Sequence, residues 1–289
     1  MGRRESSVFR LALISVPLQV PGNRLKRLLP SAVRRSLRLF LRETPIRVRD
    51  FSGDIGDLLG YRNAELRLPP ARLRRKVGGV SSRQEFTSVG RTACNQITAA
   101  LNACSAPGGG FDRWLDFGCG SGRISRHVEK LPRVRDLCGV DIDGDAISWA
   151  ARYLSGTYKT IDATPPMDFP AARFDVVYAV SVFTHLDEQA QLAWLHELHR
   201  ILRPGGLLIS STSSPSLSFG RPDLTPAQQQ TLASRGFLFA PGEGSDFNRE
   251  TAFHSNEYLL AVWGRLFGQL RFQAYGLGGY QDLTVWVKW

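Results

Sequence analysis

From residue 85 to residue 212, short apolar segments alternate with amphipathic ones. The apolar segments have the length and composition of buried strands and lie at 113–117, 136–142, 157–162, 174–181 and 207–212. The amphipathic segments have apolar residues at helical spacing and lie at 85–104, 121–131, 143–154 and 187–202. Strands that alternate with helices in this way predict a parallel sheet covered on both faces.

The C-terminal part has a different pattern. Residues 253–267 have helical spacing, and two strand-like segments follow near 269–275 and 282–288, joined by the turn sequence GLGGY. This order predicts an antiparallel hairpin at the sheet edge. We therefore expect an α/β fold with a doubly wound sheet of seven strands, mostly parallel, with a C-terminal antiparallel hairpin. The polar, glycine-rich residues 213–253 lie before the last helix, and we expect them to be mobile.

The basic residues are concentrated at the N-terminus. Residues 1–83 contain 19 of the 37 Lys and Arg residues but only 6 of the 26 Asp and Glu residues, so this part has a net charge of +13 and residues 84–289 one of −2. This distribution predicts a basic N-terminal extension, 1–83, on a near-neutral domain, 84–289. Residues 30–43 have the spacing of a basic amphipathic helix, which either contacts an anionic membrane through residues 1–49 or packs on its own domain. Residues 50–83 have the composition of a linker or a lid.

Cysteine usage and hydropathy favour a cytoplasmic protein. The four cysteines form no CxxC pair, and no His/Cys cluster has zinc-ligand spacing, so we expect free thiols and no metal. No apolar stretch reaches the roughly 18–20 residues that span a bilayer. Residues 9–20 are apolar but are interrupted by Pro17 and Gln19, which argues against an export signal.

The candidate chemistry lies at the carboxyl ends of the predicted strands, where doubly wound sheets bind ligands. The first strand leads into DFGCGSGR, 116–123, in which glycines allow positive φ and close approach of a ligand to the main chain. Asp141 ends the second strand and is placed to accept hydrogen bonds from ribose hydroxyls, while Asp162 ends the third and is placed to meet an adenine amino group. The spacing GxGxG, unlike GxGxxG, argues against a dinucleotide.

These residues carry a family resemblance. The stretches LDFGCGSGR, GVDID, IDA, FDVVYAVSVFTHL and LRPGG resemble the class I S-adenosylmethionine-dependent methyltransferases over about residues 85–289. The terminal hairpin is this family's addition to a Rossmann-like sheet. The sequences FTHLDE, WLHEL, FHSNEY and QDL are similar to those of a bacterial subgroup that acts on small molecules.

The resemblance implies specific roles. It assigns the methionine end of S-adenosylmethionine to Asp116 and the main chain of Phe117, Gly118 and Gly120, and it implies that these glycines lack side chains because the cofactor lies on them. It assigns the adenosine to Asp141, Ile142, Asp162 and Ala163, and the methyl-transfer site to Ala179 and Ser181. His185 is a candidate base or a structural residue, and His254 is a weaker candidate base.

The resemblance implies methyl transfer by in-line displacement to a small-molecule or glycan- or lipid-linked acceptor, at oxygen. Where the family methylates nucleobase amino groups it has Asn/Asp-Pro-Pro-aromatic after strand four, and this chain has AVSV there. A nucleic-acid acceptor is therefore disfavoured. The alternative of an RNA methyltransferase requires that the basic extension bind the phosphates of the RNA. An NAD-dependent oxidoreductase and a cofactor-binding protein without catalysis are further alternatives. Residues 213–253 are expected to cover the acceptor. The sequence does not predict the oligomeric state.

Overall fold

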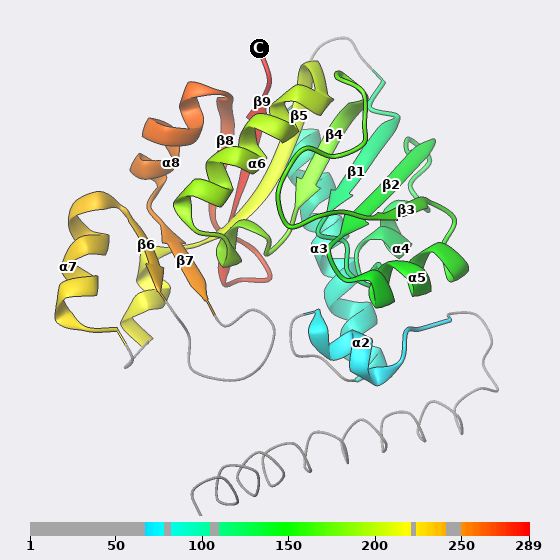
Figure 1. The fold of residues 1–289 in the computed structure, drawn as a ribbon, viewed down its shortest axis with the longest axis horizontal. Helices are drawn as coiled ribbons and strands as arrows, with labels where there is room; N and C mark the ends of the chain where they lie inside the picture. Colours follow the sequence, from blue (N-terminus) through cyan, green and yellow to red (C-terminus); the bar gives the residue numbers. More distant parts are fainter. Residues whose placement is uncertain (1–66, 78–81, 105–109, 221–223, 241–249) are drawn as a thin grey trace, which may run out of the picture. The chain divides into compact units, whose positions relative to one another are not determined.

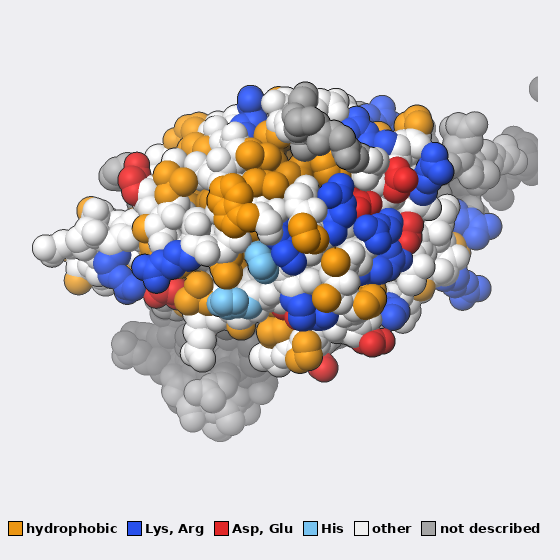
Figure 2. Space-filling view, turned by 90° about the horizontal axis from the view of Figure 1, so that it is seen from above, with side chains coloured by type: hydrophobic (Ala, Val, Ile, Leu, Met, Phe, Trp, Pro, Cys, Tyr) orange, Lys and Arg blue, Asp and Glu red, His pale blue; other side chains and the backbone are white. Residues whose placement is uncertain are grey.

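The computed structural model describes residues 67–77, 82–104, 110–220, 224–240 and 250–289, all within the compact unit Ser52–Trp289. The predicted amphipathic helix and its membrane contact lie outside the described residues. No helix within the described ranges is long and apolar enough to cross a bilayer. In Figure 2, Lys and Arg side chains on the visible face are interspersed with Asp, Glu and hydrophobic side chains.

The central sheet contains the seven predicted strands. Its parallel part has the order β3-β2-β1-β4-β5 (Figure 1), with β1 at Arg113–Phe117, β2 at Asp136–Asp141, β3 at Thr157–Thr160, β4 at Phe174–Ala179 and β5 at Leu202–Ser213. Strand β9, Gln281–Val287, pairs antiparallel with β5 and with β8, Gly268–Leu277. The predicted parallel sheet with a C-terminal antiparallel hairpin is therefore confirmed.

Both faces of the central strands β1, β2 and β4 are buried because alternate residues pack against different helices. Trp114 packs in the cluster that contains residues of α3 (Arg83–Ala103), which lies on this face with α4 (Ser125–Val128) and α5 (Gly144–Tyr153). Leu115, the next residue, packs in the cluster that contains α6 (Glu188–Ile201) and α8 (Asn256–Val262). This two-sided burial explains why the strands are continuously apolar in sequence.

Residues 213–253 contain more regular structure than the sequence predicts. They include η3 (Pro215–Gly220), α7 (Pro226–Arg235), β6 (Phe237–Ala240) and most of β7 (Thr251–His254). Strand β7 pairs antiparallel with β6 and touches the end of β5 at Ser213. Among the described residues the sheet thus has nine strands, two more than predicted, because strands of four residues give little periodic signal. The predicted helix 253–267 begins only at Asn256, after the N-cap Ser255.

The predicted helix 121–131 is shorter than expected. Only Ser125–Val128 is α-helical, because the glycine loop continues into it as turns, with Gly122 at φ 71°. The strand predicted at 207–212 begins earlier than expected, because residues 203–206 already belong to β5.

Part of the predicted N-terminal extension lies against the sheet domain. Residues 67–77, which we name the strap, contain the short helix α2 (Ala71–Lys76). The Arg126 guanidinium donates to the carbonyl of Arg67 at 3.0 Å, and Arg72 forms an ion pair with Asp145 of α5 at 2.8 Å. The strap therefore belongs to the surroundings of the glycine loop and α5.

Candidate functional site

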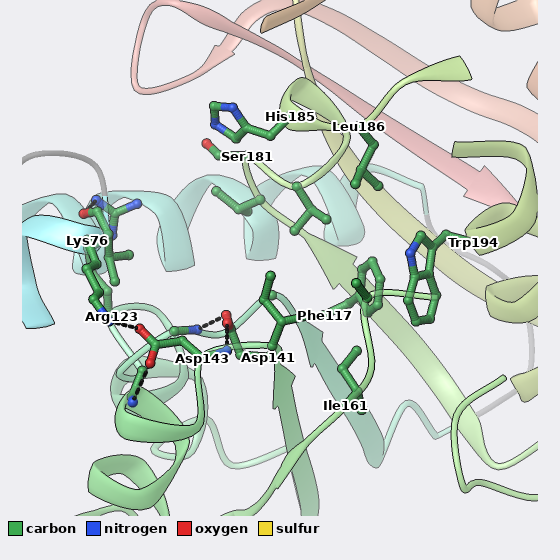
Figure 3. A pocket seen from close by; sticks show the side chains of 18 of the residues that line it. Lys76, Phe117, Arg123, Asp141, Asp143, Ile161, Ser181, His185, Leu186 and Trp194 are labelled. Carbon is green, nitrogen blue, oxygen red and sulfur yellow. Dashed lines mark hydrogen bonds and ion pairs between the residues drawn. The ribbon is translucent and has the colours of Figure 1, made fainter. Parts of the chain in front are cut away.

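A cavity of about 420 Å³ lies at the carboxyl ends of the parallel strands (Figure 3). One wall is apolar and is formed by Phe117, Ile161, Leu186 and Trp194. The other is charged and is formed by Lys76, Arg123, Asp141 and Asp143. Its lining comes from the strap, the glycine loop, the β2–α5 connection, the segment after β4 and the β8–β9 turn.

The glycine loop lines the cavity with main chain. Gly118 and Gly120 have φ values of 80° and 52°, in the left-handed region that favours glycine. A Cβ on Gly118 would lie 2.3 Å from Cγ2 of Val182, and a Cβ on Gly120 would lie 2.8 Å from Cγ2 of Val77. The chain's own conformation and contacts therefore require glycine at both positions, whether or not a cofactor lies on them.

Asp141 presents its carboxylate to the cavity from the end of β2. Its Oδ2 accepts from the backbone N–H of Gly120 at 2.7 Å, and its Oδ1 accepts from that of Asp143 at 2.9 Å. Burial raises the pKa of this carboxyl. Each carboxylate oxygen has a second lone pair, so Asp141 can accept two further hydrogen bonds, as ribose hydroxyls require. Ile142 beside it is an apolar side chain with 54% of its surface exposed, placed to contact a flat apolar group.

Asp143 and Lys76 connect this region to the strap. Asp143 caps α5 by accepting from the backbone N–H groups of Asp145 and Ala146. Its other carboxylate oxygen forms an ion pair with Nζ of Lys76 at 2.7 Å. The ion pair therefore holds the end of α2 beside the carboxyl end of β2.

Asp116 does not line the cavity. Its buried carboxylate accepts from the Ser125 hydroxyl at 2.5 Å, and burial raises its pKa to about 7. The side chain thus joins the end of β1 to the first turn of α4. The structure supports a role for Asp116 in holding the loop, whereas the resemblance implies contact with the methionine end.

The other predicted cofactor residues divide into two groups. Phe117, Ala163 and Ser181 line the cavity with the glycines and Asp141. Asp162 is exposed and is not among the lining residues, and Ala179 is buried in the sheet core. These two positions are the ones that the structure does not bring to the cavity.

His185 lines the cavity from the 3₁₀ turn Phe183–His185 after β4. Its Nδ1 lies 2.8 Å from the carbonyl oxygen of Glu250. A carbonyl only accepts, so Nδ1 carries the proton, and Nε2 of the neutral ring can accept one. Burial lowers the pKa of His185, which keeps the ring neutral near pH 7.

His254 is fully buried in β7 and does not line the cavity. The Gln191 amide donates to the carbonyls of Phe183 and Leu186, so its Oε1 is the acceptor for Nε2–H of His254 at 3.0 Å. Burial lowers the pKa of His254 to about 3. The structure therefore makes His254 part of the support for the turn that carries His185.

Several lining residues were not predicted from the sequence, namely Lys76, Val77, Arg123, Trp194, Tyr280 and Gln281. Tyr280 and Gln281 reach the cavity because β9 pairs with β5 beside β4. The Ser181 hydroxyl donates to Oε1 of Gln281 at 3.0 Å, and its N–H donates to the Ser211 hydroxyl at 2.8 Å. These contacts hold Ser181 at φ 58°, a left-handed conformation that is unusual for serine.

The cavity fits an adenosine with a charged tail. Asp141 supplies hydrogen-bond acceptors, Ile142 and the apolar wall supply surface for a base, and the main chain at Gly118 and Gly120 lies open to the cavity. The cationic Arg123 lies on the same wall as the acids. This combination suits S-adenosylmethionine.

Comparison with known proteins agrees with this assignment. Residues 115–210 match the methyltransferase domain family. The chain is similar to a ubiquinone biosynthesis O-methyltransferase of Cereibacter sphaeroides, with 36% identity over 35% of this chain and 40% of the relative. It is also similar to a fatty-acid O-methyltransferase of Mycolicibacterium smegmatis, with 27% identity over 47% of this chain and 50% of the relative. The chain thus spans half or less of the length of these relatives.

A solved structure, that of the PH0226 protein from Pyrococcus horikoshii OT3, has the same fold, with a TM-score of 0.51 and 19% identity over 71% of this chain and 95% of that one. The domain match covers β1 to β5, the strands whose carboxyl ends form the cavity. The chain is therefore similar to the methyltransferase domain family over this part of the fold.

Proposed function

We propose that this protein transfers a methyl group from S-adenosylmethionine to an oxygen of a small-molecule acceptor, with His185 as the general base. The observation that carries the proposal is the placement of His185 at the cavity, with Nδ1 hydrogen-bonded to the Glu250 carbonyl and with no hydrogen bond to Nε2 among the described residues. The O-methyltransferase names of both relatives agree with an oxygen acceptor.

The chain's own residues divide the work of binding. Asp141 would accept hydrogen bonds from the ribose hydroxyls, and Ile142 and Ala163, which line the cavity, would contact the adenine. Gly118 and Gly120 allow the rest of the cofactor to lie against the main chain. When bound, S-adenosylmethionine supplies a sulfonium methyl group that is already activated for displacement. The protein then chiefly has to align the acceptor, and such alignment contributes up to about 7–11 kcal/mol in favourable cases.

His185 is needed only because a hydroxyl must lose its proton as it becomes a nucleophile. Its Nε2 accepts that proton, and the Glu250 carbonyl, which remains bonded to Nδ1–H, stabilises the resulting imidazolium. The lowered pKa keeps Nε2 free to accept at neutral pH. Ser181 lies near His185 at the cavity (Figure 3) and donates to Gln281, so these two side chains orient the acceptor.

The test compares wild type with His185→Asn and with His254→Asn in a screen of phenols, fatty acids and sugars with labelled S-adenosylmethionine. His185→Asn should lower kcat about 10²- to 10⁴-fold and leave the affinity for S-adenosylhomocysteine unchanged. His254→Asn should act mainly through stability, because His254 lies outside the cavity. Wild-type activity should fall as the pH drops below the ordinary histidine pKa of about 6.5, and His185→Asn should lack that acid limb. Unchanged kcat in His185→Asn would refute the catalytic role.

A glycan- or lipid-linked acceptor is a second form of the same proposal, motivated by the basic amphipathic sequence at 30–43. Deleting residues 1–49 should then reduce partitioning onto anionic vesicles without changing cofactor affinity. Equal partitioning of both forms would contradict membrane contact. RNA binding that weakens with salt would favour the alternative of an RNA methyltransferase. Tighter binding of NAD than of S-adenosylmethionine would favour an NAD-dependent oxidoreductase.

A further inference from the structure

The cavity wall contains a buried side-chain amide whose donor end has no partner. Gln281, the first residue of β9, has 6% of its surface exposed and lines the cavity. Its Oε1 accepts from the Ser181 hydroxyl at 3.0 Å, and within the described ranges no hydrogen bond uses its Nε2. An amide nitrogen carries two N–H donors, and a buried polar group ordinarily has a hydrogen-bond partner. This arrangement therefore indicates a ligand that brings a hydrogen-bond acceptor to Gln281.

Ser181 determines which end of the amide is left for the ligand. Its backbone N–H donates to the Ser211 hydroxyl at 2.8 Å, and its own hydroxyl donates to Oε1 of Gln281. These contacts hold Ser181 at φ 58°, a strained conformation of the kind that is concentrated at functional sites. The oxygen of the amide is thus used within the protein, and the nitrogen is presented to the cavity.

The surroundings of this donor restrict the kind of acceptor. Ser181 lies near His185 at the cavity (Figure 3), so the proton acceptor Nε2 of His185 and the donor of Gln281 belong to the same part of the wall. Tyr280, the preceding residue, also lines the cavity and has 51% of its surface exposed. Its ring offers an apolar surface on which another flat ring can pack.

We propose that Gln281 is a specificity-determining residue, and that the methyl acceptor is a phenol with an oxygen substituent ortho to the reacting hydroxyl. This inference rests on the proposed function. In such a phenol the reacting hydroxyl faces Nε2 of His185, the neighbouring oxygen accepts from Nε2 of Gln281, and the ring packs on Tyr280. A fatty acid offers no flat ring, and its carboxylate needs no base.

The experiment compares two phenols of nearly the same shape as acceptors, with labelled S-adenosylmethionine as the methyl donor. Guaiacol has an ortho-methoxy oxygen, and ortho-ethylphenol has a CH₂ group in its place. Wild type should use guaiacol with a kcat/KM about 10- to 100-fold higher, because ortho-ethylphenol leaves the Gln281 donor unpaired. Gln281→Leu should lose this preference, mainly through a higher KM for guaiacol. Gln273→Leu is the matched control, since Gln273 is exposed on the same hairpin outside the cavity.

Two further variants test the direction of the hydrogen bond. Gln281→Glu replaces the donor by a carboxylate, which only accepts. It should therefore disfavour guaiacol and retain catechol, whose second hydroxyl can donate to the carboxylate. Ser181→Ala leaves the amide free to turn, so it should lose part of the preference for guaiacol over ortho-ethylphenol.

The affinity for S-adenosylhomocysteine, measured by calorimetry, decides between the outcomes. Loss of the preference in Gln281→Leu at unchanged affinity supports the inference. An equal fall in activity with both phenols overturns it in favour of a structural role for Gln281, and weaker binding of S-adenosylhomocysteine overturns it in favour of a contact with the cofactor. A wild type that methylates a fatty acid or a sugar but neither phenol also overturns it and leaves the proposed function standing. A wild type that binds S-adenosylhomocysteine but methylates no oxygen acceptor contradicts both.

Discussion

Replacing Gly120 by alanine tests how the strap and the glycine loop fit together. The backbone of Gly120 has φ 52°, and a residue with a Cβ pays about 1–2 kcal/mol in this conformation. The added Cβ would also lie 2.8 Å from Cγ2 of Val77, well inside the 3.5–4.0 Å at which carbon atoms attract. Overpacking of this kind costs about 1–3 kcal/mol. Gly120→Ala should therefore lower the free energy of unfolding by about 2–5 kcal/mol.

Urea denaturation of Gly120→Ala, Val77→Ala and the double variant separates the two contributions. Val77→Ala removes the methyl group that the new Cβ would meet, so the double variant should lose about 1–3 kcal/mol less than the sum of the single variants. Gly279→Ala is the matched control, because Gly279 has φ 77° and nothing within 4 Å of its Cβ position, and it should lose only the conformational 1–2 kcal/mol. Strictly additive losses at Gly120 and Val77 would refute the contact between strap and loop.

Three further predictions concern charges away from the transferred methyl group. Burial raises the pKa of Asp116 to about 7, so between about pH 4 and 7 the native state retains a proton that the unfolded state has lost. Wild-type stability should therefore fall as the pH rises through this range. Asp116→Asn should remove this pH dependence and raise the free energy of unfolding at pH 8 by up to about 4 kcal/mol, measured by urea denaturation. Burial opposes ionisation of Asp175, but hydrogen bonds from Arg113 and Arg203 outweigh it and lower its pKa to about 2. Its stabilising contribution is thus fully present above pH 4 and is lost as the pH falls through 2. Asp175→Asn should cost about 2–3 kcal/mol at pH 7 and much less at pH 2, and an equal cost at both values would contradict the reasoning. Arg72→Gln should leave the free energy of unfolding almost unchanged, because its ion pair with Asp145 is exposed. A clear fall in the melting temperature would show that the strap depends on this ion pair.

The sequence predicted the sheet well because its signals are local. A strand buried on both faces must be continuously apolar, and 113–117 is identical with β1 for this reason. Asp141 was also predictable, because the carboxyl end of a parallel strand is fixed by the strand itself. The same rule selected Asp116 and Asp162, and the structure directs the first carboxylate to Ser125 and leaves the second exposed. Position at a strand end is therefore predictable, but side-chain direction is not.

By itself, the sequence determined the strand order along the chain, the GxGxG loop and the cofactor class, since each depends on residues close together in sequence. Only the tertiary structure decided which side chains complete the cavity. Val77 and Gln281 come from opposite ends of the described chain and meet the glycine loop and Ser181 through non-local packing. Arg123 follows the loop in sequence, but only the structure shows that its side chain is buried and lines the cavity. Desolvation depends on everything that surrounds a group, and local sequence does not contain that information.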